Sequence, residues 1–406
     1  MPKRISIDEL RPGMQIEKLD RSWLATPFLR HKMTITSHEQ IAQLKASGVR
    51  TLMVHGETAD IPTAQEPALD SISDPALTAP DDTASASSTV PLGEELPSAR
   101  HTYQAAKCIV QRAMQDTKLG RAINMDEVNR VVSDMTESVL RNPDALTSLT
   151  RLKNFDEYTF YHSVNTSILA MSLGRHLEFD RHTLHQIGVG TLLHDIGKTK
   201  IPTEILNKPG RFEPSEMEIM KQHVLRGVEV LSSTTGLGDS YLRPALEHHE
   251  RVDGTGYPHR RVRSELSQFG LIAAVVDIYD AITSDRCYHK GRAAHEALQF
   301  LYRLSLEGHL DADLVQRFIH VVGVYPVGSV VQLSTGEIGI VKEVHHHAPL
   351  APMVLIVTSP GNAVLSTPRE LDLVAQIEKP HRQITTTLHP TKAGIDPTVY
   401  LDKKVA

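Results

Sequence analysis

Histidine stands out in this chain of 406 residues, because 22 of them are histidines and they are unevenly spread. One group of histidines lies together with aspartates in the middle of the chain. Imidazole nitrogens and carboxylate oxygens together suit Fe, Mn, Zn or Co, and suit Ca or Mg poorly. Seven such residues are too many for one four-coordinate ion, so they predict two ions that share a carboxylate and leave positions for water and substrate. The candidate ligands are His162, His194, Asp195, His223, His248, His249 and Asp277.

Each of these residues also has a purely structural interpretation. A single histidine such as His162 or His223 is more often a satisfied core or surface residue than a ligand. The pair His194 and Asp195 is different, because it follows the apolar run 187–193 and is expected to be buried. Burying an unpaired charge is costly, and a metal ion would remove that cost. Asp277 follows the apolar residues 272–276 and favours the same interpretation.

Two longer motifs in this region resemble the HD-GYP family of HD-superfamily phosphohydrolases. Residues 194–198 read HDIGK, which is similar to the HD signature, and residues 249–258 read HERVDGTGYP, which is similar to the extended signature of the family. The resemblance covers roughly Asn154 to Tyr288. Shorter matches occur in the same order at residues 201–202, 207–210, 220–223, 277–281 and 285–286. Weaker matches at residues 10–14, 22–24 and 27–28 resemble a small domain that often precedes such phosphodiesterases.

The resemblance implies a phosphodiesterase that hydrolyses cyclic di-GMP to pGpG, to GMP, or to both. It implies two divalent metal ions, Fe or Mn by resemblance, with Zn physically allowed. These ions would lower the pKa of a water nucleophile and neutralise the phosphodiester oxygens. Lys198 would contact the scissile phosphate, while Tyr257 and Arg286 would contact the guanine nucleotide or its other phosphate. His162, His194, Asp195 and Asp277 would hold one ion; Asp195, His223, His248 and His249 would hold the other, with Asp195 as the bridge.

Two features of the sequence bear on this metal site. Some family members carry a glutamate one helical turn before the first ligand histidine, where this chain has Tyr158. Tyrosine is a poor ligand at neutral pH because its pKa is about 10, so we predict two ions rather than three. Adjacent residues on a helix diverge by about 100°, which leaves open whether His248 and His249 face the same ion.

The elements that must position these residues are predicted to be mainly helical. The stretch 57–99 contains neither Lys nor Arg and is rich in Ala, Ser, Thr, Pro, Asp and Glu, which predicts a flexible acidic linker. Helical periodicity then continues to about residue 322, and strand-like segments follow it. The fold class is therefore mainly α, with an all-helical HD-type catalytic bundle. The predicted parts are a small α+β domain at 1–56, the linker at 57–99, the helical catalytic domain at 100–322 and a β-rich extension at 323–406.

Composition excludes several other functions. The formal net charge of −6 argues against the broad basic surface that duplex nucleic acids require. Two cysteines, Cys108 and Cys287, cannot form a disulfide framework and fit a reducing cytoplasm. We expect neither a signal peptide nor membrane insertion, since the most apolar later stretch, residues 271–282, is short and interrupted by aspartates. The protein is therefore expected to be cytoplasmic.

Two alternative functions remain open. The chain could be an HD hydrolase of another nucleotide, although the loop at residues 253–258 favours cyclic di-GMP. It could also be a non-catalytic reader of cyclic di-GMP that signals through protein partners, although an intact ligand set with Lys198 weighs against that. The N-terminal domain suggests docking of signalling partners, but nothing in it identifies a signal.

Overall fold

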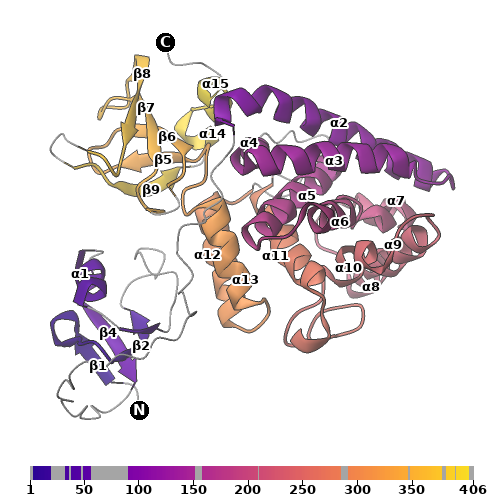
Figure 1. The fold of residues 1–406 in the computed structure, drawn as a ribbon, viewed down its shortest axis with the longest axis horizontal. Coiled ribbons are helices and arrows are strands. Elements are labelled where there is room, and N and C mark those ends of the chain that lie inside the picture. The colour runs from indigo at the N-terminus through magenta and orange to yellow at the C-terminus, as the bar shows by residue number, and fades with distance from the viewer. Residues whose placement is uncertain are drawn as a thin grey trace, which may run out of the picture. The chain divides into compact units, whose positions relative to one another are not determined.

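Helices dominate the middle of the chain, and a small antiparallel sheet lies toward each end of it (Figure 1). The chain divides into two units, Met1–Ser88 and Thr89–Ala406, which are described separately below. The computed structural model describes residues 3–19, 33–35, 38–46, 49–55, 90–150, 158–208, 210–284, 291–345, 348–376, 381–388 and 390–401.

The N-terminal unit is a four-stranded antiparallel sheet with one α-helix. The strand order is β1-β4-β2-β3, so β1 and β2 follow one another in the chain but are not neighbours in the sheet. Ser6 and Glu9 form a capping box at the 3-10 turn that follows β1, and β4 lies between β1 and β2. The weak family matches at residues 22–24 and 27–28 lie outside the described residues. The elements are β1 (Lys3–Ser6), η1 (Ile7–Glu9), β2 (Gln15–Leu19), β3 (Met33–Thr34), α1 (His38–Ala46) and β4 (Thr51–His55).

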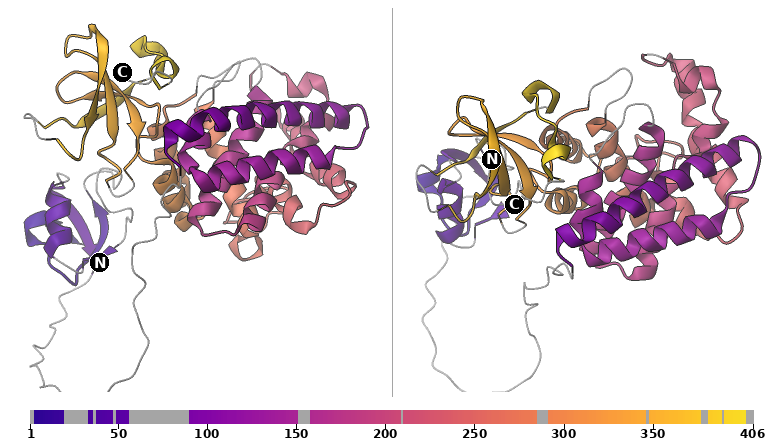
Figure 2. Two further views of the ribbon diagram at one scale, coloured as in Figure 1. Left: turned by 45° about the horizontal axis from the view of Figure 1, so that its top comes forward. Right: turned by 90° about the horizontal axis from the view of Figure 1, so that it is seen from above.

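The predicted all-helical bundle is confirmed. Its central helix, α5, is buried at every position from 161 to 174, so it presents polar residues such as His162 and Asn165 to the interior together with apolar ones. Helices α2 and α3 lie side by side along the bundle (Figures 1 and 2). The helices are α2 (Leu92–Lys118), α3 (Met125–Arg141), α4 (Pro143–Leu149), α5 (Tyr158–His176), α6 (Arg181–Leu192), η4 (Ile196–Lys200), α7 (Thr203–Leu206), α8 (Pro214–Lys221), α9 (His223–Ser232), α10 (Asp239–Glu247), η5 (Arg263–Glu265), α11 (Gln268–Thr283), α12 (Ala294–Leu306) and α13 (Ala312–Val322).

The start of the bundle differs from the prediction, because α2 begins at Leu92 and so includes residues assigned to the acidic linker. Pro97 and the acidic composition concealed this first part of the helix in the sequence. The structure shows what holds it: Glu95 is buried and its carboxylate accepts hydrogen bonds from Ser138 and Arg141 of α3, each at 2.8 Å. Helix α2 therefore takes up residues 92–99, which the sequence interpretation assigned to the linker.

We expect Glu95→Gln to destabilise the protein by about 1–3 kcal/mol at neutral pH, because it removes the charged partner of Arg141. The hydrogen bond from Arg141 outweighs burial and holds the pKa of Glu95 below its ordinary value of 4.5. Its stabilising effect is therefore complete above pH 4.5 and is lost as the pH falls through the lower folded-state pKa.

Thermal unfolding of both proteins between neutral pH and about pH 4 measures this difference. The gap between wild type and variant should narrow toward acid. Glu94→Gln is the matched control, since Glu94 is exposed on the same helical turn. A gap that is absent at neutral pH, or that widens in acid, would contradict the role assigned to Glu95.

The C-terminal part is a five-stranded antiparallel sheet in the order β8-β7-β6-β5-β9. The strand-like segments predicted after residue 322 are confirmed, and they include β8 and β9, whose sequences are largely polar and exposed. Glu337 is buried there between Arg369 and Arg382, with N–O distances of 2.8 and 2.7 Å. The elements are β5 (Val330–Leu333), β6 (Ile338–Glu343), β7 (Met353–Thr358), β8 (Val364–Asp372), β9 (Ile384–Leu388), α14 (Pro390–Ala393) and α15 (Pro397–Leu401).

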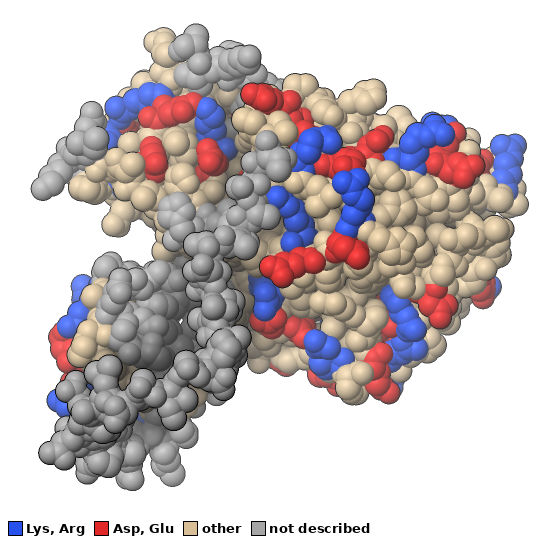
Figure 3. All heavy atoms as spheres, in the orientation of Figure 1, with Lys and Arg blue, Asp and Glu red and all other residues tan. Residues whose placement is uncertain are grey.

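The surface of the helical part carries charges of both signs. On the face seen in Figure 3, Lys and Arg side chains are interspersed with Asp and Glu side chains. Arg112 of α2, for example, pairs with Glu127 of α3 at 2.7 Å. That face therefore lacks the single-sign basic surface that binds duplex nucleic acids. Among the described residues, none of the helices has the length and hydropathy needed to cross a bilayer.

Candidate metal centre

The structure brings all seven predicted metal ligands together inside the helical bundle. They come from five places: α5, the turn between α6 and η4, the first residue of α9, the end of α10, and α11. Six of the side chains are buried and His249 is 20% exposed. Their ligand atoms form three overlapping groups in which all atoms lie within 4.8 Å of one another. The groups are His162, His194 and Asp277; His194, Asp195 and His248; and His223, His248 and His249.

Asp195 lies at the centre of this arrangement, and its two oxygens face different histidines. Oδ2 is 3.4 Å from Nε2 of His194 and 3.6 Å from Nε2 of His162. Oδ1 is 3.5 Å from Nε2 of His223 and 3.8 Å from Nε2 of His248. The carboxylate of Asp195 therefore lies between two sets of imidazole nitrogens.

Close backbone packing allows the HD turn and α9 to approach each other. His194 and Asp195 lie in the turn after α6, and Gly197 follows in η4. A Cβ atom on Gly197 would lie 1.9 Å from the carbonyl oxygen of His223 and 2.4 Å from the amide nitrogen of Gly227. Only glycine fits at position 197 without moving α9, and this contact places His223 beside Asp195.

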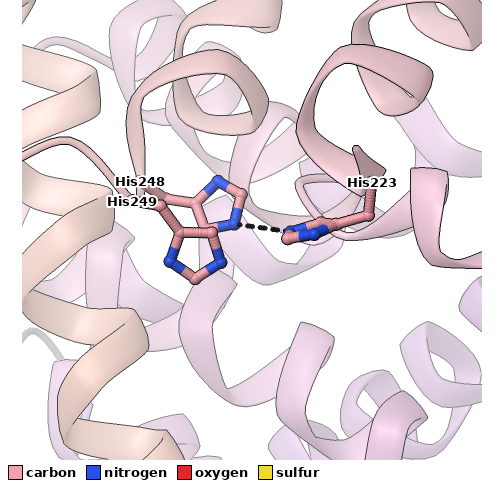
Figure 4. A group of neighbouring side chains, drawn as sticks. All are labelled: His223, His248 and His249. Carbon is pink, nitrogen blue, oxygen red and sulfur yellow. Dashed lines mark hydrogen bonds between the residues drawn. The ribbon is translucent and has the colours of Figure 1, made fainter. Parts of the chain in front are cut away.

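The neighbouring residues His248 and His249 both face the site. Helix α10 ends at Glu247, and its C-cap His248 keeps right-handed helical torsion angles (φ −62°, ψ −20°). The ring centroids are 4.0 Å apart with planes inclined at 43°. Figure 4 shows both rings beside His223, whose Nε2 lies 3.4 Å from Nε2 of His248. Both rings therefore belong to one cluster, despite the divergence of about 100° expected for adjacent residues of a helix.

Backbone carbonyls fix the tautomer of three of these histidines. Nδ1 of His194 is 2.7 Å from the carbonyl of Thr191, and Nδ1 of His223 is 2.7 Å from that of Met220. Nδ1 of His248 is 2.9 Å from the carbonyl of Pro244. A carbonyl can only accept, so each Nδ1 must donate and each Nε2 must carry a lone pair.

These Nε2 atoms converge without donors between them. Nε2 of His223 and Nε2 of His248 present lone pairs to each other, which is unfavourable unless positive charge lies between them. Nε2 of His194 and Oδ1 of Asp195 are buried without a hydrogen-bond partner in the described part of the chain. Buried acceptors of this kind are costly to leave unsatisfied, and a cation satisfies them together. The donor set therefore fits divalent metal ions of the Fe, Mn or Zn type.

Electrostatics within the cluster keep its carboxylates charged. Burial would raise the pKa of Asp195, but the positive charge of Lys198 and the surrounding imidazoles outweighs it and holds that pKa well below the ordinary value. Asp277 behaves alike: burial is outweighed by hydrogen bonding to His162, and its pKa is also held well below normal. Burial disfavours charged His162, yet hydrogen bonds to Asp277 and Asp280 raise its pKa to about 9. The position of Nε2 of His162 therefore attracts positive charge, which a proton or a metal ion supplies.

Three other histidines of the cluster, His223, His248 and His249, are held neutral, mainly by burial. Burial lowers the pKa of His223 and lowers that of His248 to about 3, while burial and the neighbouring His248 hold the pKa of His249 well below its usual value. Ionised carboxylates and neutral imidazoles are the protonation states that bind metals. The two carboxylates and these three imidazoles are therefore in the states that bind metal at neutral pH, whereas His162 has to exchange the proton on Nε2 for the metal ion.

Two of the three predicted substrate residues, Lys198 and Tyr257, are among the described residues, and both lie next to the cluster. Nζ of Lys198 pairs with Oδ2 of Asp195, and 26% of its side chain is exposed. The ring of Tyr257 stacks on His249, with centroids 4.6 Å apart and planes at 28°. Arg286 and the side chain of Tyr158 lie outside the described residues, so neither prediction about them is tested.

Two glutamates that the sequence interpretation did not assign hold the loop that carries Tyr257. Glu250 is buried and accepts hydrogen bonds from the amides of His259 (2.7 Å) and Arg261 (3.1 Å). Glu247 is buried too and ties Arg261 to the N-cap of α11 through Ser267. The loop also folds closely against its own start, since a Cβ on residue 256 would lie 2.4 Å from the backbone of residue 251. In the sequence, Glu247 and Glu250 directly flank His248 and His249, and this position could have indicated their structural role.

Asp280 was also not assigned a role from sequence, although it lies one helical turn after Asp277. It is buried, and its Oδ2 accepts a hydrogen bond from Nδ1 of His162 at 2.8 Å. Carboxylates in this position orient the histidines that bind metals and make them better ligands. The spacing of three residues between two aspartates on an apolar helix was a usable signal.

Comparisons with known proteins agree with this site. One family model, described as a domain of unknown function, matches residues 2–128, and one described as an HD domain matches residues 130–314. The cyclic di-GMP phosphodiesterase PA4108 of Pseudomonas aeruginosa is 36% identical over 375 residues, which are 92% of this chain and 89% of that protein. A cyclic di-GMP phosphodiesterase of Thermotoga maritima is 37% identical over 40% of this chain and 45% of its own length. The 3'3'-cGAMP-specific phosphodiesterase 2 of Vibrio cholerae is 42% identical over 24% of this chain and 19% of its own length.

A helical bundle that buries an HD pair among further histidines and aspartates defines an HD-domain hydrolase of the metal-dependent class. The motifs at residues 194–198 and 249–258 and the match along nearly the whole of a full-length relative narrow that class. The chain belongs to the HD-GYP family.

Proposed function

We propose that this protein is a phosphodiesterase that hydrolyses cyclic di-GMP at a centre of two divalent metal ions. The observation that carries the proposal is the position of Asp195, whose two oxygens face two different sets of histidine Nε2 atoms. A relative that is 36% identical over 92% of this chain is named a cyclic di-GMP phosphodiesterase. The loop that ends in Gly256, Tyr257 and Pro258 is the part of the motif that supports this substrate.

The ligands are proposed to divide between the ions around Asp195. His162, His194, Asp195 and Asp277 would hold the first ion, and Asp195, His223, His248 and His249 would hold the second. The short distances within the groups of ligand atoms support this division. We propose Fe or Mn as the resident metal, with Zn as the alternative that the donor set allows.

Two such ions, when bound, supply positive charge to the phosphodiester oxygens and lower the pKa of a water nucleophile. The chain's own residues contribute position and additional charge. Lys198 places its ammonium group next to Asp195 and partly in solvent, where it can contact the scissile phosphate. The carboxylate of Asp280 and the backbone carbonyls orient the imidazoles, so no ligand has to reorganise during the reaction.

Tyr257 is proposed to contact the guanine nucleotide or its second phosphate, as is Arg286. The ring of Tyr257 stacks on the ring of His249, and Nζ of Lys221 lies 5.5 Å from the centroid of the Tyr257 ring. The aromatic ring is therefore fixed beside a metal ligand and a second lysine. That combination of an aromatic surface with positive charge suits a nucleotide monophosphate unit.

Purified protein loaded with Mn(II) or Fe(II) and incubated with cyclic di-GMP tests the proposal, with products separated by chromatography. Release of pGpG or GMP is expected, and pGpG as a second substrate shows whether the second bond is cut. Parallel incubation with 3'3'-cGAMP tests another nucleotide as the substrate. Binding of cyclic di-GMP without turnover would instead favour a non-catalytic reader.

We expect Lys198→Met to lower kcat by about 100- to 1,000-fold, the usual loss when one electrostatic donor to a transition state is removed. Metal content should stay at the wild-type level, because the variant removes a positive charge from beside the ions. Metal analysis and steady-state kinetics on the same sample measure both effects. Lys200→Met is the matched control, since Nζ of Lys200 lies on the same 3-10 turn but donates to the carbonyl of Thr117 in α2. Wild-type kcat in Lys198→Met would contradict the assigned role.

A further inference from the structure

A chain of buried hydrogen bonds runs from α2 to the candidate metal ligand His162. The hydroxyl of Tyr103 is 2.7 Å from Oδ1 of Asn165, and Nδ2 of Asn165 is 2.9 Å from Oδ1 of Asp280. Oδ2 of Asp280 is 2.8 Å from Nδ1 of His162. All four side chains are at most 3% exposed. The chain therefore connects a helix that carries none of the predicted ligands to the centre of the site.

The direction of every bond in this chain is fixed by chemistry. Nδ2 of Asn165 lies near both the carbonyl of Thr150, at 3.1 Å, and the carboxylate of Asp280, and both of these groups accept. The amide nitrogen of Asn165 must therefore face them, and its oxygen must face Tyr103. The tyrosine hydroxyl is then the donor to Asn165, and burial raises its pKa, so it keeps its proton. Nδ1 of His162 donates to Asp280 in both protonation states of the ring, so Nε2, which faces Asp277 at 3.0 Å, is the atom left for a proton or a metal ion.

We propose that Tyr103 is a positioning residue for the metal ion held by His162, acting through Asn165 and Asp280. This inference rests on the metal-binding role proposed above for His162. Removing the tyrosine hydroxyl leaves Oδ1 of Asn165 buried without a donor, and rotation of that amide would turn its oxygen toward the carboxylate of Asp280. The carboxylate would lose a donor and the orientation of the His162 ring would be less strictly fixed. Tyr103 also lies outside residues 130–314 that the HD-domain model matches, so its role extends the site beyond that domain.

A purely structural role for Tyr103 makes a different prediction. Its ring packs near Tyr161, with centroids 6.1 Å apart, and a packing residue would affect stability rather than one metal ion. Tyr161 offers a matched control, because it lies beside His162 in sequence and its hydroxyl is 3.5 Å from Nζ of Lys107. Substituting either tyrosine by phenylalanine removes one hydroxyl and keeps the ring.

Titration of the full-length protein with Mn(II) alone, after removal of bound metal, tests the proposal. We expect Tyr103→Phe to weaken one of two Mn(II) sites by about 10-fold, the lower end of the effect of residues that orient metal-binding histidines. The second site, and both sites in Tyr161→Phe, should keep wild-type affinity. Wild-type affinity at both sites in Tyr103→Phe, or equal weakening of both, would overturn the proposal. Wild-type protein that binds no Mn(II) would overturn the proposed function and this inference with it.

Asn165→Ala interrupts the same chain at its next member and provides a second test that does not depend on the folding of Tyr103→Phe. It should weaken the same single site by about 10-fold or more. If the two residues act in series, the double variant Tyr103→Phe/Asn165→Ala should bind Mn(II) no more weakly than Asn165→Ala alone. Additive weakening in the double variant, or loss at the other site in Asn165→Ala, would overturn the proposal.

Discussion

Asp195→Ala should remove both metal ions and lower hydrolysis of cyclic di-GMP by more than about 1,000-fold, since one electrostatic donor alone contributes roughly 100- to 1,000-fold. The physical reason is the shared position of this carboxylate. Its oxygens lie 3.4 to 3.8 Å from Nε2 of four histidines, so its removal takes a ligand and a negative charge from both ions. Elemental analysis and product chromatography of one purified sample measure both effects.

A control is needed because Asp195 is a buried carboxylate, and losing any such group can destabilise a protein. Glu337→Gln removes a buried, ion-paired carboxylate from the C-terminal sheet, where it pairs with Arg369 and Arg382. That variant should lose stability but keep its metal content and its turnover per folded molecule. Hydrolysis that survives in Asp195→Ala would refute the assignment of the site, and loss of metal in Glu337→Gln would show that metal content follows general stability.

Removal of the metal ions by a chelator should lower the melting temperature substantially. Binding at a free metal concentration about 1,000-fold above Kd stabilises a protein by about 4 kcal/mol, if the unfolded chain does not bind. In a unit of this size, 1 kcal/mol shifts the melting temperature by roughly 2–4 °C, which predicts a decrease of about 8–16 °C. In the described part of the chain, the Nε2 atoms of His223 and His248 face each other and Oδ1 of Asp195 has no hydrogen-bond partner. Removing the ions leaves these buried acceptors unsatisfied, which lowers the melting temperature.

Differential scanning calorimetry before chelation, after it, and after metal is returned measures this effect. Mn(II), Fe(II) or Zn(II) should restore the melting temperature, whereas Mg(II) should not, because imidazole nitrogens suit it poorly. Asp195→Ala should show no metal-dependent shift and is the matched control. An unchanged melting temperature after chelation of protein shown to contain metal would contradict the proposed centre.

The sequence predicted the chemistry of the site well because that chemistry depends on residue types and order. Asp195 and Asp277 follow apolar runs, and a carboxylate there needs a positive partner wherever the helices pack. The motifs at residues 194–198 and 249–258 indicated the family because they too consist of residue types in a fixed order. Their glycines include Gly197, which lies where two backbone segments are in close contact. Helix periodicity similarly predicted the bundle, because its buried faces repeat at the helical period.

The boundary at α2 and the way His248 and His249 share one site depended on contacts that no local pattern records. Glu95 looked like part of an acidic linker, yet Arg141 and Ser138 of another helix make it a buried anchor. Adjacent histidines should diverge by about 100° on a helix, yet the rings of His248 and His249 lie together, with centroids 4.0 Å apart.

By itself, then, the sequence indicated that the motifs at residues 194–198 and 249–258, with further histidines and aspartates of a helical bundle, form a metal centre of the HD type. The tertiary structure decided which atoms meet there. It placed the two oxygens of Asp195 between separate groups of Nε2 atoms, and it connected Tyr103 to His162 through residues far apart in the chain. The physical reason is that burial and residue type are local properties of a sequence, whereas hydrogen-bond direction and ligand convergence arise only when distant helices pack.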